Sequence, residues 1–324
     1  MIIDGIDYNI LDVYDLSVTV PDSFVVNENK TCKGHGEAKL YMGSKDHMRE
    51  FYANSVEDQG FEVDCIILKA DLLQYMNVIN HEYHNPSIQY RGQGTKKNMA
   101  ELWKKRLGCI NDIQDTVLKF KIKDQNQITG NRGYVKTTTN ALSGGYGIIR
   151  KIALPFVSYI SVMKIQNVET QDIIFYWKLF ADFSQMAEQQ YMAKNYGKKK
   201  AKKLKSARDG QIAYRQQLFN LFGHCPFSKI DDIRLLIASH IKPWAVCEKN
   251  EKTDLSNGLM LSPLFDKLFD RGYITFEDDG ALKVSDWLSQ ANKDRINFEY
   301  IVQDLHLTPE RIVYLRYHRK YVFK

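Results

Sequence analysis

The chain has 324 residues, 44% of them hydrophobic and 26% charged, and its formal net charge is +6. This length exceeds the usual size of one compact domain and predicts two, while the mild basic excess says little about partners by itself. No apolar run approaches the about 18 residues that a membrane span requires, and the scattered cysteines form no CxxC pair, so the sequence argues against a membrane protein or a disulfide scaffold and favours a cytoplasmic protein.

The N-terminal part mixes two periodicities. Apolar and polar side chains alternate over much of residues 1–70 and again later, a pattern typical of strands. The predicted strands are SFVVNEN, EAKLYMG, FEVDCIILKA and DTVLKFKIKD, and the predicted helices, with apolar residues at helical spacing, are ADLLQYMNVINHEY and NMAELWKKRL. We therefore expect residues 1–194 to form a mixed α/β domain that recognises a target or senses a partner.

Three further segments of this domain carry separate predictions. TTTNALSGGYG (137–147) is a polar, glycine-rich segment without phosphate-binding spacing, and we expect a loop. QDIIFYWKLFADFSQMAEQQYMAKNYG (171–197) has apolar residues at helical intervals, and we expect a long helix. In residues 80–98, aromatic and basic side chains such as Tyr83 and Arg91 interleave, which suits nucleic-acid contact; a polar loop between helices is the alternative.

A basic run separates the two predicted domains. KNYGKKKAKKLKSAR (194–208) holds eight basic residues in fifteen and no acid, and we assign 195–207 as a basic linker. Such a run attracts a polyanion through counterion release, although a solvated linker explains it equally well. The predicted phosphate contacts are Lys198, Lys199, Lys200, Lys202, Lys203 and Arg208, with Arg215 on the helix that follows.

Residues 208–324 are predicted to form the second domain. In chain order we expect an amphipathic helix in GQIAYRQQLFNLFG, a strand in RLLIASHI, a strand in NGLMLSP, a helix in PLFDKLFDRG and a hairpin in GYITFEDDGALKVS. Pro263 starts the second helix and Gly272 ends it, both at positions that these residues favour. The order strand, loop, strand, helix places three polar side chains at the ends of these elements.

These side chains are His240, Asn257 and Asp266. His240 ends an apolar strand, where an imidazole can take a proton from water near neutral pH. Asn257 opens the second strand and can hold the intervening loop through backbone hydrogen bonds. Asp266 lies early in the helix and offers the hard oxygen ligands that suit magnesium or manganese.

The arrangement resembles the HNH, or ββα-metal, nuclease family. SHIKPW supplies His240, DLSNGLMLSP supplies Asn257, and Asp266 follows nine residues later, while RDGQIAYR, GHCPFSK and LFDRG resemble the flanks of HNH domains in restriction-type endonucleases. The resemblance covers roughly residues 205–288 and implies an α+β protein with a C-terminal ββα-metal nuclease domain. It further implies that His240 activates water, Asn257 organises the loop, and Asp266 with His240 holds Mg²⁺ or Mn²⁺.

The resemblance implies a metal-dependent endonuclease that hydrolyses double-stranded DNA in a restriction or phage-defence system. A homodimer is an open alternative, since one such site cuts one strand. Two other functions stay open: a nonspecific effector nuclease activated by a partner or ligand, and a catalytically silent nucleic-acid-binding protein. The silent alternative arises because Ser239 stands where many family members place a metal-binding Asp or His.

Overall fold

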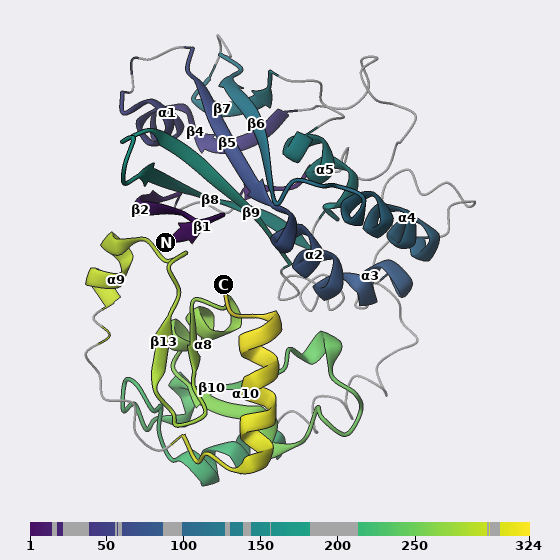
Figure 1. Ribbon diagram of the computed structural model, residues 1–324. Coiled ribbons are helices and arrows are strands. Elements are labelled where there is room, and N and C mark those ends of the chain that lie inside the picture. The colour runs from purple at the N-terminus through teal and green to yellow at the C-terminus, as the bar shows by residue number, and fades with distance from the viewer. Residues whose placement is uncertain are drawn as a thin grey trace. The chain divides into compact units, whose positions relative to one another are not determined.

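The computed structural model divides into two compact units, one formed by residues up to 181 and one by residues from 213 onward (Figure 1). The residues that the structure describes are 1–14, 18–21, 39–55, 57, 60–86, 99–126, 130–138, 144–155, 157–181, 213–296, 298 and 305–324. The predicted linker and its lysines, the predicted strand SFVVNEN and residues 87–98 lie outside them. No helix in the described ranges is long and apolar enough to span a bilayer.

The first unit is built on one mixed sheet. Eight of its described strands follow the order β1-β2-β8-β9-β5-β6-β7-β4, and β3 pairs with β8. Neighbouring strands are antiparallel except β5 and β9, which are parallel. The strands are β1 (Ile2–Ile3), β2 (Ile6–Val13), β3 (Val18–Thr19), β4 (Lys39–Ser44), β5 (Glu62–Leu68), β6 (Val117–Asp124), β7 (Arg132–Thr137), β8 (Ser158–Asn167) and β9 (Ile173–Ala181).

Aromatic side chains on β9 fix which helices cover one face of this sheet. Phe175 and Trp177 lie two residues apart on the strand and therefore point to the same face. Phe175 packs against Phe51 and Tyr52 of α1 (Lys45–Ala53), with ring centroids 5.6 and 4.7 Å apart. Trp177 packs against Tyr146 of α5 (Gly144–Ile152), so α1 and α5 cover the same face.

The other described helices of the first unit pack against one another. They are α2 (Lys69–Val78), α3 (Asn80–His84) and α4 (Met99–Asn111). Tyr176, which points to the face opposite Trp177, donates its hydroxyl hydrogen bond to Asp71 of α2. The predicted helices of this region are confirmed, and α1, which the sequence reasoning did not single out, is added to them.

Two predictions for the first unit are wrong. Residues 173–181, predicted as helix, form strand β9, because the run IIFYWKLFA pairs along β8 and is buried on both faces of the sheet. Residues 144–147, predicted as loop, begin helix α5. Gly145 allows this helix to approach the sheet, since a Cβ there would lie 2.6 Å from Cγ2 of Ile67.

The second unit has the element order that the sequence predicts. A helix covers residues 213–222 and ends before Gly223, whose φ is +69°. β10 (Ile237–His240) and β11 (Gly258–Leu261) form an antiparallel pair, and α8 (Pro263–Asp270) follows. The hairpin of β12 (Ile274–Phe276) and β13 (Leu282–Val284) is also confirmed, and α9 (Gln290–Ile296) and α10 (Pro309–Tyr321) complete the unit.

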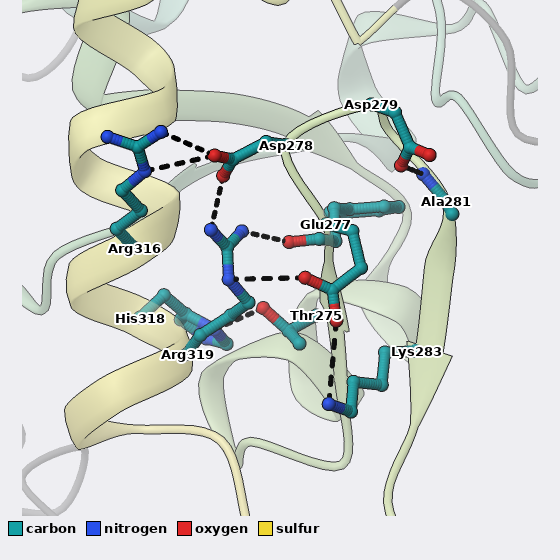
Figure 2. Close-up of polar contacts among 10 residues, drawn as sticks. Thr275, Glu277, Asp278, Asp279, Ala281, Lys283, Arg316, His318 and Arg319 are labelled. Atoms are coloured by element: carbon teal, nitrogen blue, oxygen red, sulfur yellow. Dashed lines mark hydrogen bonds and ion pairs between the residues drawn. The ribbon is translucent and has the colours of Figure 1, made fainter.

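Helix α10 holds the β12–β13 hairpin through polar contacts (Figure 2). His318 is buried, stacks on Phe269, and bonds Thr275 through Nδ1 at 2.9 Å and the Phe269 carbonyl through Nε2 at 3.0 Å. Arg316 and Arg319 pair with Asp278 at the hairpin turn. The elements of both units confirm the mixed α+β architecture predicted from the sequence. Helix α10 belongs to the same unit as the strand pair β10 and β11.

Candidate nuclease site

A glycine on one of the two short strands of the site lets an aromatic ring approach closely. The register places His240 opposite Gly258 and Ser239 opposite Leu259. A Cβ at position 258 would lie 2.2 Å from the hydroxyl oxygen of Tyr214, so only glycine admits this ring. The Tyr214 hydroxyl then donates to the Asn257 carbonyl at 3.2 Å.

His240 is enclosed by aromatic rings on two sides. Its ring stacks on Tyr214, with centroids 4.7 Å apart, and meets the ring of Trp244 edge-on at 5.2 Å. Nε2 lies 3.1 Å from the carbonyl oxygen of Lys252. A carbonyl can only accept, so Nε2 carries the hydrogen and Nδ1 is unprotonated in the neutral ring. Burial lowers the pKa of His240, an effect that its bond to the Lys252 carbonyl opposes.

Asn257 ties together the loop between the strands. The side chain is fully buried. Its Oδ1 accepts from the Lys242 backbone N–H at 2.8 Å, and its Nδ2 donates to the Glu251 carbonyl at 3.0 Å and to Sγ of Cys247 at 3.2 Å. One amide therefore links both ends of the segment that carries the Lys252 carbonyl against His240.

Helix α10 supports the same loop from outside. Arg311, which is 2% exposed, donates to the Leu255 carbonyl at 2.8 Å. The hydroxyl of Tyr314 donates to Oδ2 of Asp254 at 2.9 Å, and the other carboxylate oxygen accepts from the Ser256 N–H. The last turn before β11 is thus fixed by two side chains of α10.

Asp266 lies in the first turn of α8 beside Ser239 of β10. Burial raises the pKa of Asp266, while the Ser239 hydroxyl and the Lys267 charge oppose the rise. The Ser239 hydroxyl is buried and makes no well-aligned hydrogen bond to another described residue. A carboxylate next to an unsatisfied hydroxyl is a hard oxygen donor pair that fits Mg²⁺ or Mn²⁺. The described residues contain no group of three or more His, Cys, Asp or Glu able to hold a metal.

The other residues singled out from the sequence are placed less favourably or lie outside the described ranges. The Arg215 guanidinium donates to the carbonyls of Ile233 and Leu236, so its phosphate contact stays a prediction. Tyr83, predicted as a surface aromatic, is buried and donates to the Ile152 carbonyl at 2.7 Å. The five linker lysines and Arg208 lie outside the described residues.

Sequence reasoning missed the tyrosine ring that stacks on His240. Tyr214 had no assigned role, yet its ring covers one face of His240. The signal was Gly258: a glycine opening a short apolar strand indicates that another group approaches the backbone there. The supports from α10 left no local signal, because Arg311 and Leu255 meet only through the tertiary fold.

A strand that ends in histidine, an asparagine directly before the paired strand and a helix bearing aspartate form an arrangement typical of the ββα nuclease class. Residues 225–277 match the family model described as HNH endonuclease, and the matched segment contains all three side chains. The chain thus carries an HNH endonuclease domain toward its C-terminus, as its sequence indicates. A search of curated proteins finds no match to the chain.

Proposed function

We propose that the protein is a metal-dependent endonuclease that hydrolyses DNA phosphodiester bonds in a restriction or phage-defence system. The observation that carries the proposal is the state of His240: its Nε2 is occupied by the Lys252 carbonyl, and Nδ1 is left as a base. The matched HNH segment supports the reaction class. A cytoplasmic setting is proposed with it, since the described cysteines are free thiols.

In the proposed reaction, Nδ1 of His240 removes a proton from water as the water oxygen bonds to phosphorus. The bond from phosphorus to the 3′-oxygen breaks, and the products are a 5′-phosphate and, after proton uptake from solvent, a 3′-hydroxyl. Tyr214 and Trp244 hold the ring plane, so that Nδ1 keeps its direction. Asn257 acts one step further away by fixing the loop that bonds Nε2.

Asp266 is the proposed metal ligand, with His240 and the Ser239 hydroxyl beside it. Bound Mg²⁺ or Mn²⁺ would neutralise phosphate charge and stabilise the leaving oxygen. Partial burial keeps the Asp266 carboxylate away from bulk water and raises its pKa. A cation bound to the carboxylate is therefore favoured over an isolated negative charge. Double-stranded DNA is the proposed substrate, with a homodimer as the arrangement that would cut both strands.

One observation favours the ligand-activated nuclease as a second candidate. The first unit contains a pocket of about 480 Å³ between α1 and strands β2, β8 and β9, within the range of small-molecule sites. Asp12, Glu50 and Lys164 are among its lining residues. The Lys164 ammonium is buried and uses two of its three donors on the Phe51 carbonyl and Asn54 Oδ1. A pocket lined by both charged and apolar side chains suits a small regulatory ligand.

The test measures plasmid cleavage with magnesium, with and without EDTA. His240→Ala should lower the rate by about 10²–10⁴-fold, because a general base is removed. Asp266→Ala should lose activity that higher manganese partly restores, because phosphate and water still hold the ion. His224→Ala, a histidine at the end of the helix over residues 213–222, serves as the control and should cleave normally. Wild-type activity in His240→Ala, or equal cleavage in EDTA, would remove this mechanism.

A further inference from the structure

Strands β6, β7 and β4 are neighbours in the sheet (Figure 1). One face of these strands carries a concentration of cations. Along β6, buried Leu118, Phe120 and Ile122 alternate with lysines that point the other way. These lysines are Lys119, Lys121 and Lys123, and β7 adds Arg132 and Lys136 to the same face. The face therefore opposes the one on which Phe120 packs against Trp177.

The cross-strand register aligns three lysines in one row. Lys123 of β6 is opposite Lys136 of β7, and Lys136 is opposite Lys39 of β4. Like charges directly opposite each other in a sheet are destabilising, so the juxtaposition of Lys123 and Lys136 costs folding free energy. The other face of these strands is packed in the core. A polyanion bound to the lysine face would remove the repulsion.

Among the described residues, few acidic side chains pair with the cations of β6 and β7. Asp64 of β5 pairs with Lys121 at 3.6 Å, an exposed interaction that contributes little. Glu62 is opposite Lys123 in the register but forms no ion pair with it. No acid in the described part of the chain lies within ion-pair distance of Lys123 or Lys136.

Two tyrosines interrupt the cations. Tyr41 of β4 is opposite Tyr134 of β7, and their ring centroids are 5.4 Å apart. Tyr41 is 45% exposed, and Nζ of Lys39 lies 4.6 Å from the centroid of the Tyr134 ring. An exposed ring and a half-buried one beside cations offer a surface on which bases stack while phosphates contact lysine.

We propose that this sheet face binds single-stranded nucleic acid, with bases on Tyr41 and Tyr134 and phosphates along Lys123 and Lys136. The inference rests on the proposed function in that a nuclease domain brings the chain to nucleic acid. A duplex keeps its base faces stacked inside and presents only edges and phosphates, so the tyrosines select an unpaired segment. Tyr134 lies two residues from Lys136 on β7, about 7 Å away at about 3.4 Å per residue, so the tyrosines and the lysines form two adjacent rows across the strands.

The experiment measures binding by the full chain carrying His240→Ala, so that cleavage does not consume the probe. The probes are a labelled oligothymidylate, an oligouridylate of equal length and a duplex of equal length. The test variant is Lys123→Gln with Lys136→Gln, and its matched control is Lys104→Gln with Lys151→Gln on α4 and α5. Thermal unfolding confirms that each variant folds.

We expect the test variant to weaken single-strand binding and to reduce the slope of log affinity against log salt by about 1.4, since each phosphate that a lysine neutralises accounts for about 0.7. Tyr41→Ala should weaken binding about 10-fold and Tyr41→Phe should restore it, because stacking needs the ring and not the hydroxyl. The two single-stranded probes show whether DNA or RNA is preferred.

Equal binding by the test and control variants would overturn the proposal. So would equal loss of duplex binding, or displacement of the oligonucleotide by polyglutamate as effectively as by unlabelled strand, which would assign the face to acidic proteins. Binding is measured without cleavage, so an inactive HNH site leaves this result intact. Conversely, if the sheet face binds no nucleic acid, plasmid cleavage by the HNH domain should persist.

Discussion

His240 is held so that only one of its nitrogens is available for chemistry. The Lys252 carbonyl fixes the hydrogen on Nε2, and the rings of Tyr214 and Trp244 restrict the imidazole plane. The same enclosure removes water from the ring, which disfavours the imidazolium and lowers the pKa of His240. Orientation and protonation state thus have one structural origin.

A pH dependence follows at this residue. A base with a lowered pKa is neutral at pH 7, so cleavage should be fully active above about pH 6.5 and should be lost only as pH falls through a value below that. The measurement is kcat/KM against pH for plasmid cleavage. Tyr214→Leu admits water to the ring and should move the acidic limb upward toward about 6.5. An acidic limb that lies above that value in the unmodified protein would contradict the enclosure argument.

Three proposed site residues could be placed on their elements from sequence because their signals are local. His240, Asn257 and Asp266 stand at short offsets on elements marked by Pro263 and Gly272. Tyr214 could not be assigned a role, since its packing against His240 joins elements whose arrangement no local pattern specifies. The missing information was tertiary structure, and only Gly258 pointed to it.

At the scale of elements, α10 is part of the site although it lies outside the matched residues 225–277. Arg311 and Tyr314 hold the turn that precedes β11, and Thr308 caps the helix that presents them. The two hydrogen bonds act on a backbone carbonyl and on a capping carboxylate. The geometry of Asn257 therefore depends on a helix more than 50 residues further along the chain.

Tyr314→Phe should lower the free energy of unfolding by about 1 kcal/mol, because one hydrogen bond is removed. Arg311→Met should cost about 3 kcal/mol, because buried carbonyls lose a charged donor. Both should lower kcat more than they raise KM, since the loop positions His240. Urea unfolding and cleavage kinetics measure the two effects. Val313→Ala, 62% exposed on the same helix, is the control, and equal losses there would refute a positioning role.

The two elements that sequence reasoning placed wrongly have different physical causes. β9 is buried on both faces, so its residues do not alternate in polarity, and the remaining apolar spacing resembles a helix. α5 begins with glycines that disfavour helix locally, but Gly145 is needed for close packing on Ile67 and Phe120. Strand β6 and helix α8 were predictable because β6 alternates cleanly and α8 has clear end signals, and β5 was predictable from its β-branched residues.

At the scale of the whole molecule, the chain forms two compact units. In the sequence, the basic segment lies between the last described residue of the first unit and the first described residue of the second. Phosphate contacts made by such a segment would add affinity for any sequence and leave target choice to other surfaces. The sheet face of β4, β6 and β7 is a second candidate binding surface, in the first unit. Nucleic acid would then engage each unit separately.

Replacing Lys198, Lys199, Lys200, Lys202 and Lys203 together by glutamine should weaken duplex binding at every sequence. The slope of log affinity against log salt should fall by about 0.9 for each duplex phosphate that a lysine no longer neutralises, and the preferred cleavage sequence should persist. Binding is measured at several salt concentrations with the His240→Ala background. A variant with five arginines instead preserves charge and should bind normally. An unchanged slope would make the segment a solvated linker.

The hydrogen bond from Arg311 to Leu255 affects which amino-acid substitutions the domain tolerates in evolution. Arg311 reaches the main-chain carbonyl of Leu255, which every amino acid supplies. Position 255 is therefore free to drift in sequence as far as this hydrogen bond is concerned. No replacement there can compensate for loss of the arginine, so the two positions should not vary as a correlated pair. This hydrogen bond therefore depends on one residue of a helix that the family match does not include.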